Sequence, residues 1–255
     1  MAGCVGVERP TYKFFISSTP ALRLLSTKGS SKEQEVVKIK INMVIVIFIL
    51  DNFLNSVKLC INFNHIIQRR FKMQSENEYI GDDKFKNFLN HYECPTSLEV
   101  VKLKFAGAIC SPNLNLRPTD VISSFWEQNK QPRLETKKEA ELFFKFFMGL
   151  WDNIFDKIRR NKLSLSKAPK DDETWGQVRF EELEYGFLEG FWGGCDDLKV
   201  PNYVAQIVDS LSEMADAYAM LAKKASMSKE QKAISNALLN TDKTVEKALA
   251  FIIEN

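Results

Sequence analysis

The side chains of this sequence that could do chemistry are two groups of acids in its C-terminal half. They are Glu181, Glu182, Glu184 and Glu189 within one predicted helix, and Asp171, Asp172 and Glu173 before it. Neighbouring carboxylates can serve as general acid and base when burial shifts their pKa values. A di-iron bundle also needs Glu-x-x-His pairs, which the chain lacks. We interpret these acids as solvated helix faces and caps. The alternative is an enzyme with a cryptic carboxylate site among Glu181–Glu189.

The histidines and cysteines form no recognisable metal or nucleophile site. His65 and His91 are far apart and belong to no HxH or HExxH pattern. The five cysteines have no CxxC pair, so we expect reduced, buried thiols: Cys4, Cys60, Cys94, Cys110 and Cys195. No GxSxG, GxxxxGK[ST] or GxGxxG pattern occurs in a suitable context. The sequence therefore predicts no catalytic residue, no metal and no cofactor.

Charge divides the chain into two unlike parts. Residues 1–72 hold eleven Lys or Arg and four Asp or Glu, for a net charge of +7. Residues 73–255 hold 24 basic and 29 acidic residues, for a net charge of −5. Nucleic-acid surfaces need clustered basic residues to neutralise phosphates. An acidic globular part therefore argues against a nucleic-acid partner.

Residues 136–160 predict one long amphipathic helix at the centre of a helical core. Thr136 and Glu139 fit a capping box at its start. Apolar residues then recur every three or four positions: Ala140, Phe143, Phe144, Phe147, Leu150, Trp151, Ile154, Phe155 and Ile158. This aromatic stripe is wide enough to be buried along its length, and we place Trp126 and Trp151 in the same core.

Start and stop signals divide the rest of the globular part into further helices. The predicted starts are Asp82 or Asp83, Thr96, Pro118, Ser228 and Thr241 or Asp242, and Asn240 fits a helix end. Helices are expected over 178–192, 200–225 and 228–254. Gly186, Gly190 and Gly194 recur every four residues, which predicts that a neighbouring helix approaches closely. Because no period-two alternation occurs, the predicted fold is all-α, built from packed antiparallel helices.

Residues 161–177 are polar, contain Pro169 and Gly176, and predict an exposed loop that is a possible internal domain boundary. Trp175 falls in this predicted loop. Aromatic residues dominate the energetics of protein interfaces, so Trp175 and Trp192 are the candidate interaction residues.

Residues 1–72 predict a poorly structured or mis-annotated N-terminal extension, and residues 73–255 the helical domain. The opening residues have the composition of a transit peptide. They also resemble upstream sequence translated in frame, with the native start at Met73. The apolar run 41–50 is interrupted by charges too soon for a spanning helix of roughly 20 residues. We expect a cytoplasmic protein, with a membrane anchor at 41–63 as the alternative.

Four segments between about residues 80 and 195 resemble the YecA/YgfB-like family of small bacterial all-helical proteins. The segments are 97–107, Arg117–Asp120 with Phe125-Trp126, 139–154, and Gly186-Phe187-Leu188-Glu189-Gly190, the closest match. Leu103-Lys104 replaces the family's usual Asp-Gly, and its cysteine-rich zinc-binding tail is absent. The resemblance implies a helical fold and carries over no catalytic residue. With a full helical core and no convergent polar site, the sequence favours a bacterial protein that acts by binding another protein.

Overall fold

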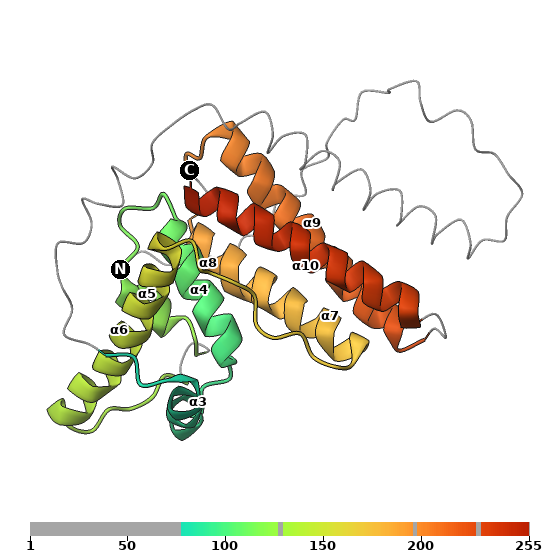
Figure 1. Cartoon of the computed structure of the whole chain (residues 1–255). Coiled ribbons are helices and arrows are strands. Elements are labelled where there is room, and N and C mark those ends of the chain that lie inside the picture. The colour runs from blue at the N-terminus through green and yellow to red at the C-terminus, as the bar shows by residue number, and fades with distance from the viewer. Residues whose placement is uncertain (1–77, 127–129, 196–197, 228–230, 255) are drawn as a thin grey trace, which may run out of the picture. The chain divides into compact units, whose positions relative to one another are not determined.

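The computed structural model describes residues 78–126, 130–195, 198–227 and 231–254, which form helices and connecting segments without any strand among them. In chain order the elements are α3 (Asp82–His91), α4 (Leu98–Cys110), α5 (Pro118–Ser123), α6 (Lys137–Arg159), α7 (Asp172–Glu181), the π-helix η2 (Glu182–Leu188), α8 (Glu189–Trp192), α9 (Asn202–Ala225) and α10 (Gln231–Glu254). Figure 1 shows their arrangement. The all-α class is confirmed.

The predicted long helix is α6, and it begins as expected. Thr136 precedes it, and its hydroxyl accepts a hydrogen bond from the Glu139 N–H at 3.1 Å. Phe147 in the middle of α6 is fully buried in an aromatic cluster shared with α3, α4 and the turn that follows α5. Its ring centroid lies 5.0 to 6.3 Å from those of Phe85, Phe88, Phe105, Phe125, Trp126 and Phe143. Trp126 and Trp151 are buried, as predicted.

Helix α4 packs against η2 and α8 with almost no room between the two backbones. A Cβ added at Gly107 would overlap the carbonyl of Phe187, and one added at Gly190 would overlap the carbonyl of Lys104. Gly186 meets the first turns of α4, so the two stretches run in the same direction. The prediction of a close helix approach is thus confirmed for two glycines of the repeat. It is wrong for Gly194, which has a φ of 72° just after α8 and no heavy atom near its missing Cβ.

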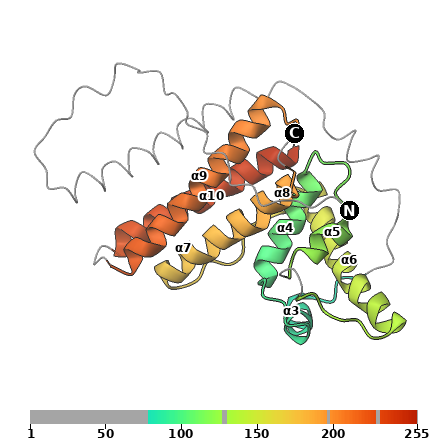
Figure 2. The ribbon, with the colours of Figure 1, turned by 180° about the vertical axis from the view of Figure 1, so that it is seen from behind.

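Helices α9 and α10 run antiparallel along one side of α7, as the views in Figures 1 and 2 agree. Both are single helices of 24 residues. At Gly176 the α7 backbone lies directly against Tyr218 and Ala222 of α9, where a side chain would not fit. Close packing thus explains a glycine inside α7, although glycine disfavours a helix by about 1 kcal/mol relative to alanine.

Several predicted helix ends need correction. Gly81 precedes α3, and Asp82 and Asp83 lie in its first turn. Ser97 caps α4, while the Thr96 hydroxyl donates to the Phe125 carbonyl instead. On α10, three expected boundary residues lie within a continuous helix: Asn240, Thr241 and Asp242. Short polar side chains have more uses than capping, so local sequence alone misassigned them.

The predicted loop 161–177 is also wrong in its second half. Asp171 accepts a hydrogen bond from the Thr174 N–H at 2.8 Å and starts α7 at Asp172. Trp175 therefore lies on a helix. The remaining segment, 162–171, is not wholly exposed, because Leu165 is buried. A single hydrophobic core cluster contains side chains from the chain before this segment and from the chain after it.

The predictions for residues 1–72, for a start at Met73 and for an anchor at 41–63 lie outside the described residues. Within the described part of the chain, none of the helices combines the length and the apolar character needed to cross a membrane.

Candidate functional site

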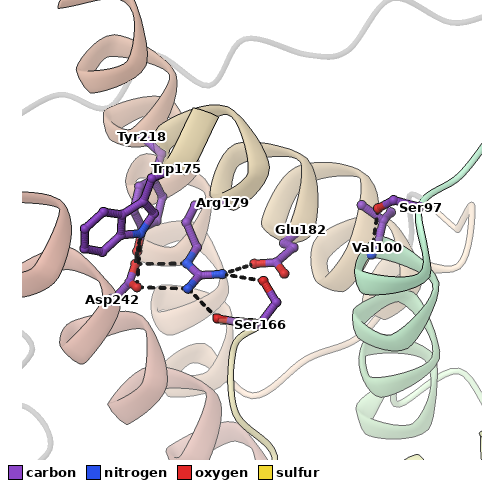
Figure 3. A network of polar contacts seen from close by, with 8 residues as sticks. All are labelled: Ser97, Val100, Ser166, Trp175, Arg179, Glu182, Tyr218 and Asp242. Atoms are coloured by element: carbon purple, nitrogen blue, oxygen red, sulfur yellow. Dashed lines mark hydrogen bonds and ion pairs between the residues drawn. The ribbon is translucent and has the colours of Figure 1, made fainter. Parts of the chain in front are cut away.

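A buried polar network centred on Arg179 is the most organised group of charged side chains in the described residues. Arg179 is 1 % exposed. Its Nε and Nη2 donate to the two carboxylate oxygens of Asp242 at 3.1 and 3.0 Å. Nη2 also donates to the Ser166 carbonyl at 2.7 Å, and Nη1 donates to the Ser166 hydroxyl at 2.9 Å and to Glu182 Oε2 (Figure 3). A guanidinium has five N–H donors, so every donor of Arg179 is used.

Asp242 of α10 connects three helices through its carboxylate. Besides the two bonds from Arg179, it accepts one from the Trp175 indole N–H at 3.2 Å and one from the Tyr218 hydroxyl at 2.6 Å. Burial raises the pKa of Tyr218, and the nearby Asp242 charge adds to the increase. Tyr218 therefore stays a neutral donor. The network holds α7, α9, α10 and the segment before α7 in one arrangement.

Glu182 is the least satisfied member of the network. It is 1 % exposed, and its Oε2 accepts from Arg179. Its other oxygen, Oε1, is buried and has no hydrogen-bond partner among the described residues. Burial raises the pKa of Glu182, while the charge of Arg179 acts in the opposite direction. The expectation that Glu182 belongs to a solvated face is therefore wrong.

Glu182 opens the π-helical turn that joins α7 to α8. The segment Glu182–Leu188 is wound more widely than an α-helix, and single π-turns of this kind occur often at functional sites. The ring of Tyr185 in this stretch lies against the ring of Phe180 on α7, with centroids 5.6 Å apart. At Gly186 and Gly190 the backbone of this stretch lies directly against α4. The π-turn and the close contact with α4 together fix the position of Glu182 beside Arg179.

The other predicted acids do not gather around Glu182. Glu181 accepts from the Gln177 side chain at 2.7 Å, and Glu189 accepts from Lys104 of α4 at 3.0 Å. Among the described residues, no group of three or more His, Cys, Asp or Glu side chains is placed to hold a metal ion. The geometry thus yields an arginine shared by two carboxylates, not a pair of carboxylates open to a substrate.

The two candidate interaction residues are both half-buried. Trp175 packs against the core and donates to Asp242. Trp192 lies at the end of α8 with its ring against Phe191, at a centroid distance of 5.4 Å. Of the cysteines in the described residues, Cys94 and Cys110 are half-buried, and Cys195 is exposed. The expectation of buried thiols is therefore wrong for Cys195.

Larger apolar side chains reach the surface on α6. Leu142 is 50 % exposed and Phe144 is 39 % exposed, on either side of the buried Phe143. One turn further on, Phe146 and Met148 are partly buried against the core. Three consecutive residues of an α-helix span roughly 200° of its circumference. The apolar face of α6 is therefore wider at this end than the core can cover.

No protein-family model, curated protein or solved structure matches this chain.

Proposed function

We propose that the protein acts by binding another protein, and that the amino-terminal half of α6 forms the contact. The observation that carries this proposal is the pair Leu142 and Phe144, both large, apolar and solvent-exposed on the two flanks of one helix. A core-facing helix needs an apolar stripe of only about 100°. The extra apolar width of α6 serves no packing purpose within the described part of the chain.

The spacing of these side chains suits a helical partner. Leu142 and Phe146 are four residues apart on one flank, and Phe144 and Met148 are four apart on the other. Residues at this spacing form the ridges that pack into the grooves of a neighbouring helix. An amphipathic helix of the partner protein would therefore fit along either flank, as in other helix-recognition modes. Trp192, half-buried at the end of α8, is a second candidate contact.

An enzyme with a carboxylate site is the other class to consider, because Glu182 is buried and the pKa of Glu182 is raised. A general acid must reach the atom that it protonates within hydrogen-bond distance. The enclosed position of Glu182 and its bond to Arg179 give no such access in this conformation. The geometry favours binding over catalysis. A cytoplasmic location and a place in the YecA/YgfB-like family remain part of the proposal.

A double substitution tests the contact. We expect Leu142→Glu with Phe144→Glu to abolish most of the affinity for a stoichiometric partner, because losing apolar hot spots costs about 2 kcal/mol or more. Leu239→Glu on α10 is a matched control, since Leu239 is 46 % exposed. The partner would be identified by cross-linking in extracts of the source cells and its affinity measured with purified proteins.

Two results would count against this proposal. One is a partner that binds the double variant as tightly as the wild type. The other is a purified chain that captures no stoichiometric partner although its thermal unfolding is normal.

A further inference from the structure

The charges of the buried network do not balance if all its carboxylates are ionised. Arg179 contributes one positive charge, and Asp242 and Glu182 would contribute two negative charges. A buried charge without compensation is costly, and buried acids commonly take up a proton instead. Asp242 accepts four hydrogen bonds, two of them from the guanidinium of Arg179. Glu182 accepts from Arg179 through Oε2, and the Ser166 hydroxyl also lowers its pKa, but Oε1 is buried without a hydrogen-bond partner. The excess charge therefore falls on Glu182.

We propose that Glu182 takes up a proton on Oε1 in the folded protein and acts as a pH-sensitive latch on the packing of α7. Protonation makes the network neutral, with Arg179 held by the ionised Asp242. Loss of this proton to solvent leaves an excess negative charge enclosed beside Arg179. Since Arg179 also binds Ser166, the strain reaches the segment 162–171 and loosens it from α7.

Groups on all the surrounding elements bear on this proton. Arg179, on the preceding turn, favours the ionised form, and so does the hydroxyl of Ser166 from the segment before α7. Asp242 on α10 binds the same guanidinium, so the positive charge of Arg179 is shared between Asp242 and Glu182. Tyr218 on α9 is neutral and donates to Asp242. Glu99 on α4 opposes ionisation of Glu182, although its own ion pair with Lys86, at 2.8 Å, offsets part of that effect. Burial is the largest influence and raises the pKa of Glu182.

The sign of the pH effect follows from linkage. An acid with a raised folded-state pKa keeps its proton on folding, so it contributes full stability below its unfolded-state pKa of about 4.3. That contribution declines as the pH rises towards the folded-state pKa of Glu182. Above that pKa the group causes no further change in stability. Within this window, one retained proton changes the unfolding equilibrium constant by about tenfold for each pH unit.

Glu182→Gln in the full chain is the decisive variant, because glutamine has the shape of the protonated acid. We expect wild type and variant to be equally stable near pH 4. Above that, the unfolding constant of the wild type should rise relative to the variant by up to about tenfold per pH unit. The amides of 162–171 should exchange faster in the wild type by a matching ratio. Glu189→Gln is the matched control, since Glu189 is an ion-paired acid of the same helical stretch. It should keep the wild-type pH dependence.

Three results would overturn the proposal. The first is a ratio of wild-type to Glu182→Gln unfolding constants that does not change with pH. The second is a variant that becomes the less stable protein as the pH rises. The third, which needs no variant, comes from NMR of wild-type protein with isotope-labelled glutamate. If every glutamate carboxyl there titrates at its ordinary pKa, Glu182 carries no retained proton.

Discussion

The region around Phe147 and the region around Arg179 are both inaccessible to solvent, but different contacts hold them together. Phe147 touches six other aromatic rings, contributed by α3, α4, α6 and the turn after α5. Arg179 is held by directed hydrogen bonds to three residues from three separate parts of the chain: Ser166, Glu182 and Asp242. The first region depends on filling space and the second on placing donors opposite acceptors.

This difference predicts how each region responds to change. Apolar packing is non-directional, so neighbouring rings and aliphatic chains can adjust to a smaller side chain. A buried ion pair cannot adjust in the same way, because removal of one partner leaves the other charged and desolvated. The aromatic region should therefore tolerate conservative substitution, while the network should not.

The largest effect is expected from Arg179→Met, which keeps most of the side-chain volume and removes the charge. The buried Asp242 carboxylate would lose its cation and Glu182 would lose its hydrogen-bond donor, at a cost of about 4 kcal/mol in the free energy of unfolding. Urea denaturation of the full chain measures this cost. A loss below about 1 kcal/mol would mean that the network contributes little, because surface-type pairs reach only that value.

A triple variant separates the lost charge from the lost shape. Adding Glu182→Leu and Asp242→Asn to Arg179→Met removes both acids that the arginine had bound and keeps an acceptor for Trp175 and Tyr218. Replacing a buried ionic cluster with residues of similar volume is often neutral or stabilising. We therefore expect the triple variant to recover at least half of the stability that the single variant loses.

Phe147→Leu is the matching change in the aromatic region. It shrinks a fully buried ring and removes its edge and stacking contacts, which should cost about 2 kcal/mol. The same urea titration compares it with Arg179→Met on one scale. If Phe147→Leu proves the more damaging substitution, the contrast between the two regions is wrong.

The two regions also differ in how well the sequence alone predicted them. The aromatic region follows from local signals, because Thr136 caps α6 and the apolar residues repeat with the helical period. The network is built from long-range contacts. Asp242 bonds to Tyr218, Arg179 and Trp175, which are 24, 63 and 67 residues away in the sequence. Nothing near Asp242 in the sequence indicates these partners, and a short polar residue in this position predicts a helix cap instead.

A usable signal was nevertheless present in the helical period. On α10, Asp242 stands eight residues after Ile234 and four after Leu238, both buried. On α7, Arg179 stands four residues before Leu183 and eight before Phe187, both also buried. A charged residue in line with core positions of a predicted helix must find a buried partner. Opposite charges at such positions on two helices predict a pair, although not its geometry.

The smallest effect is expected at Asp152 of α6, which resembles Glu182 in that burial raises its pKa. Burial, followed by the charge of Asp156 one turn away, raises the pKa of Asp152 to about 6. The stability that this group contributes is therefore complete below about pH 4 and is lost as the pH rises to about 6. Asp152→Asn should remove this part of the pH dependence. Because Asp152 is half-exposed, we expect an effect of less than about 1 kcal/mol.

Salt distinguishes the two acids. In roughly 1 M KCl the screening length falls to about 3 Å, which weakens the repulsion between half-exposed charges such as Asp152 and Asp156. Enclosed charges are screened much less. Urea titrations at pH 4, 6 and 8, with and without salt, should show the effect of Asp152→Asn shrinking while that of Glu182→Gln persists. If salt reduces both effects equally, Glu182 is more accessible to solvent than its burial implies. The region around Arg179 would then not be an enclosed polar interior, and its contrast with the region around Phe147 would fail.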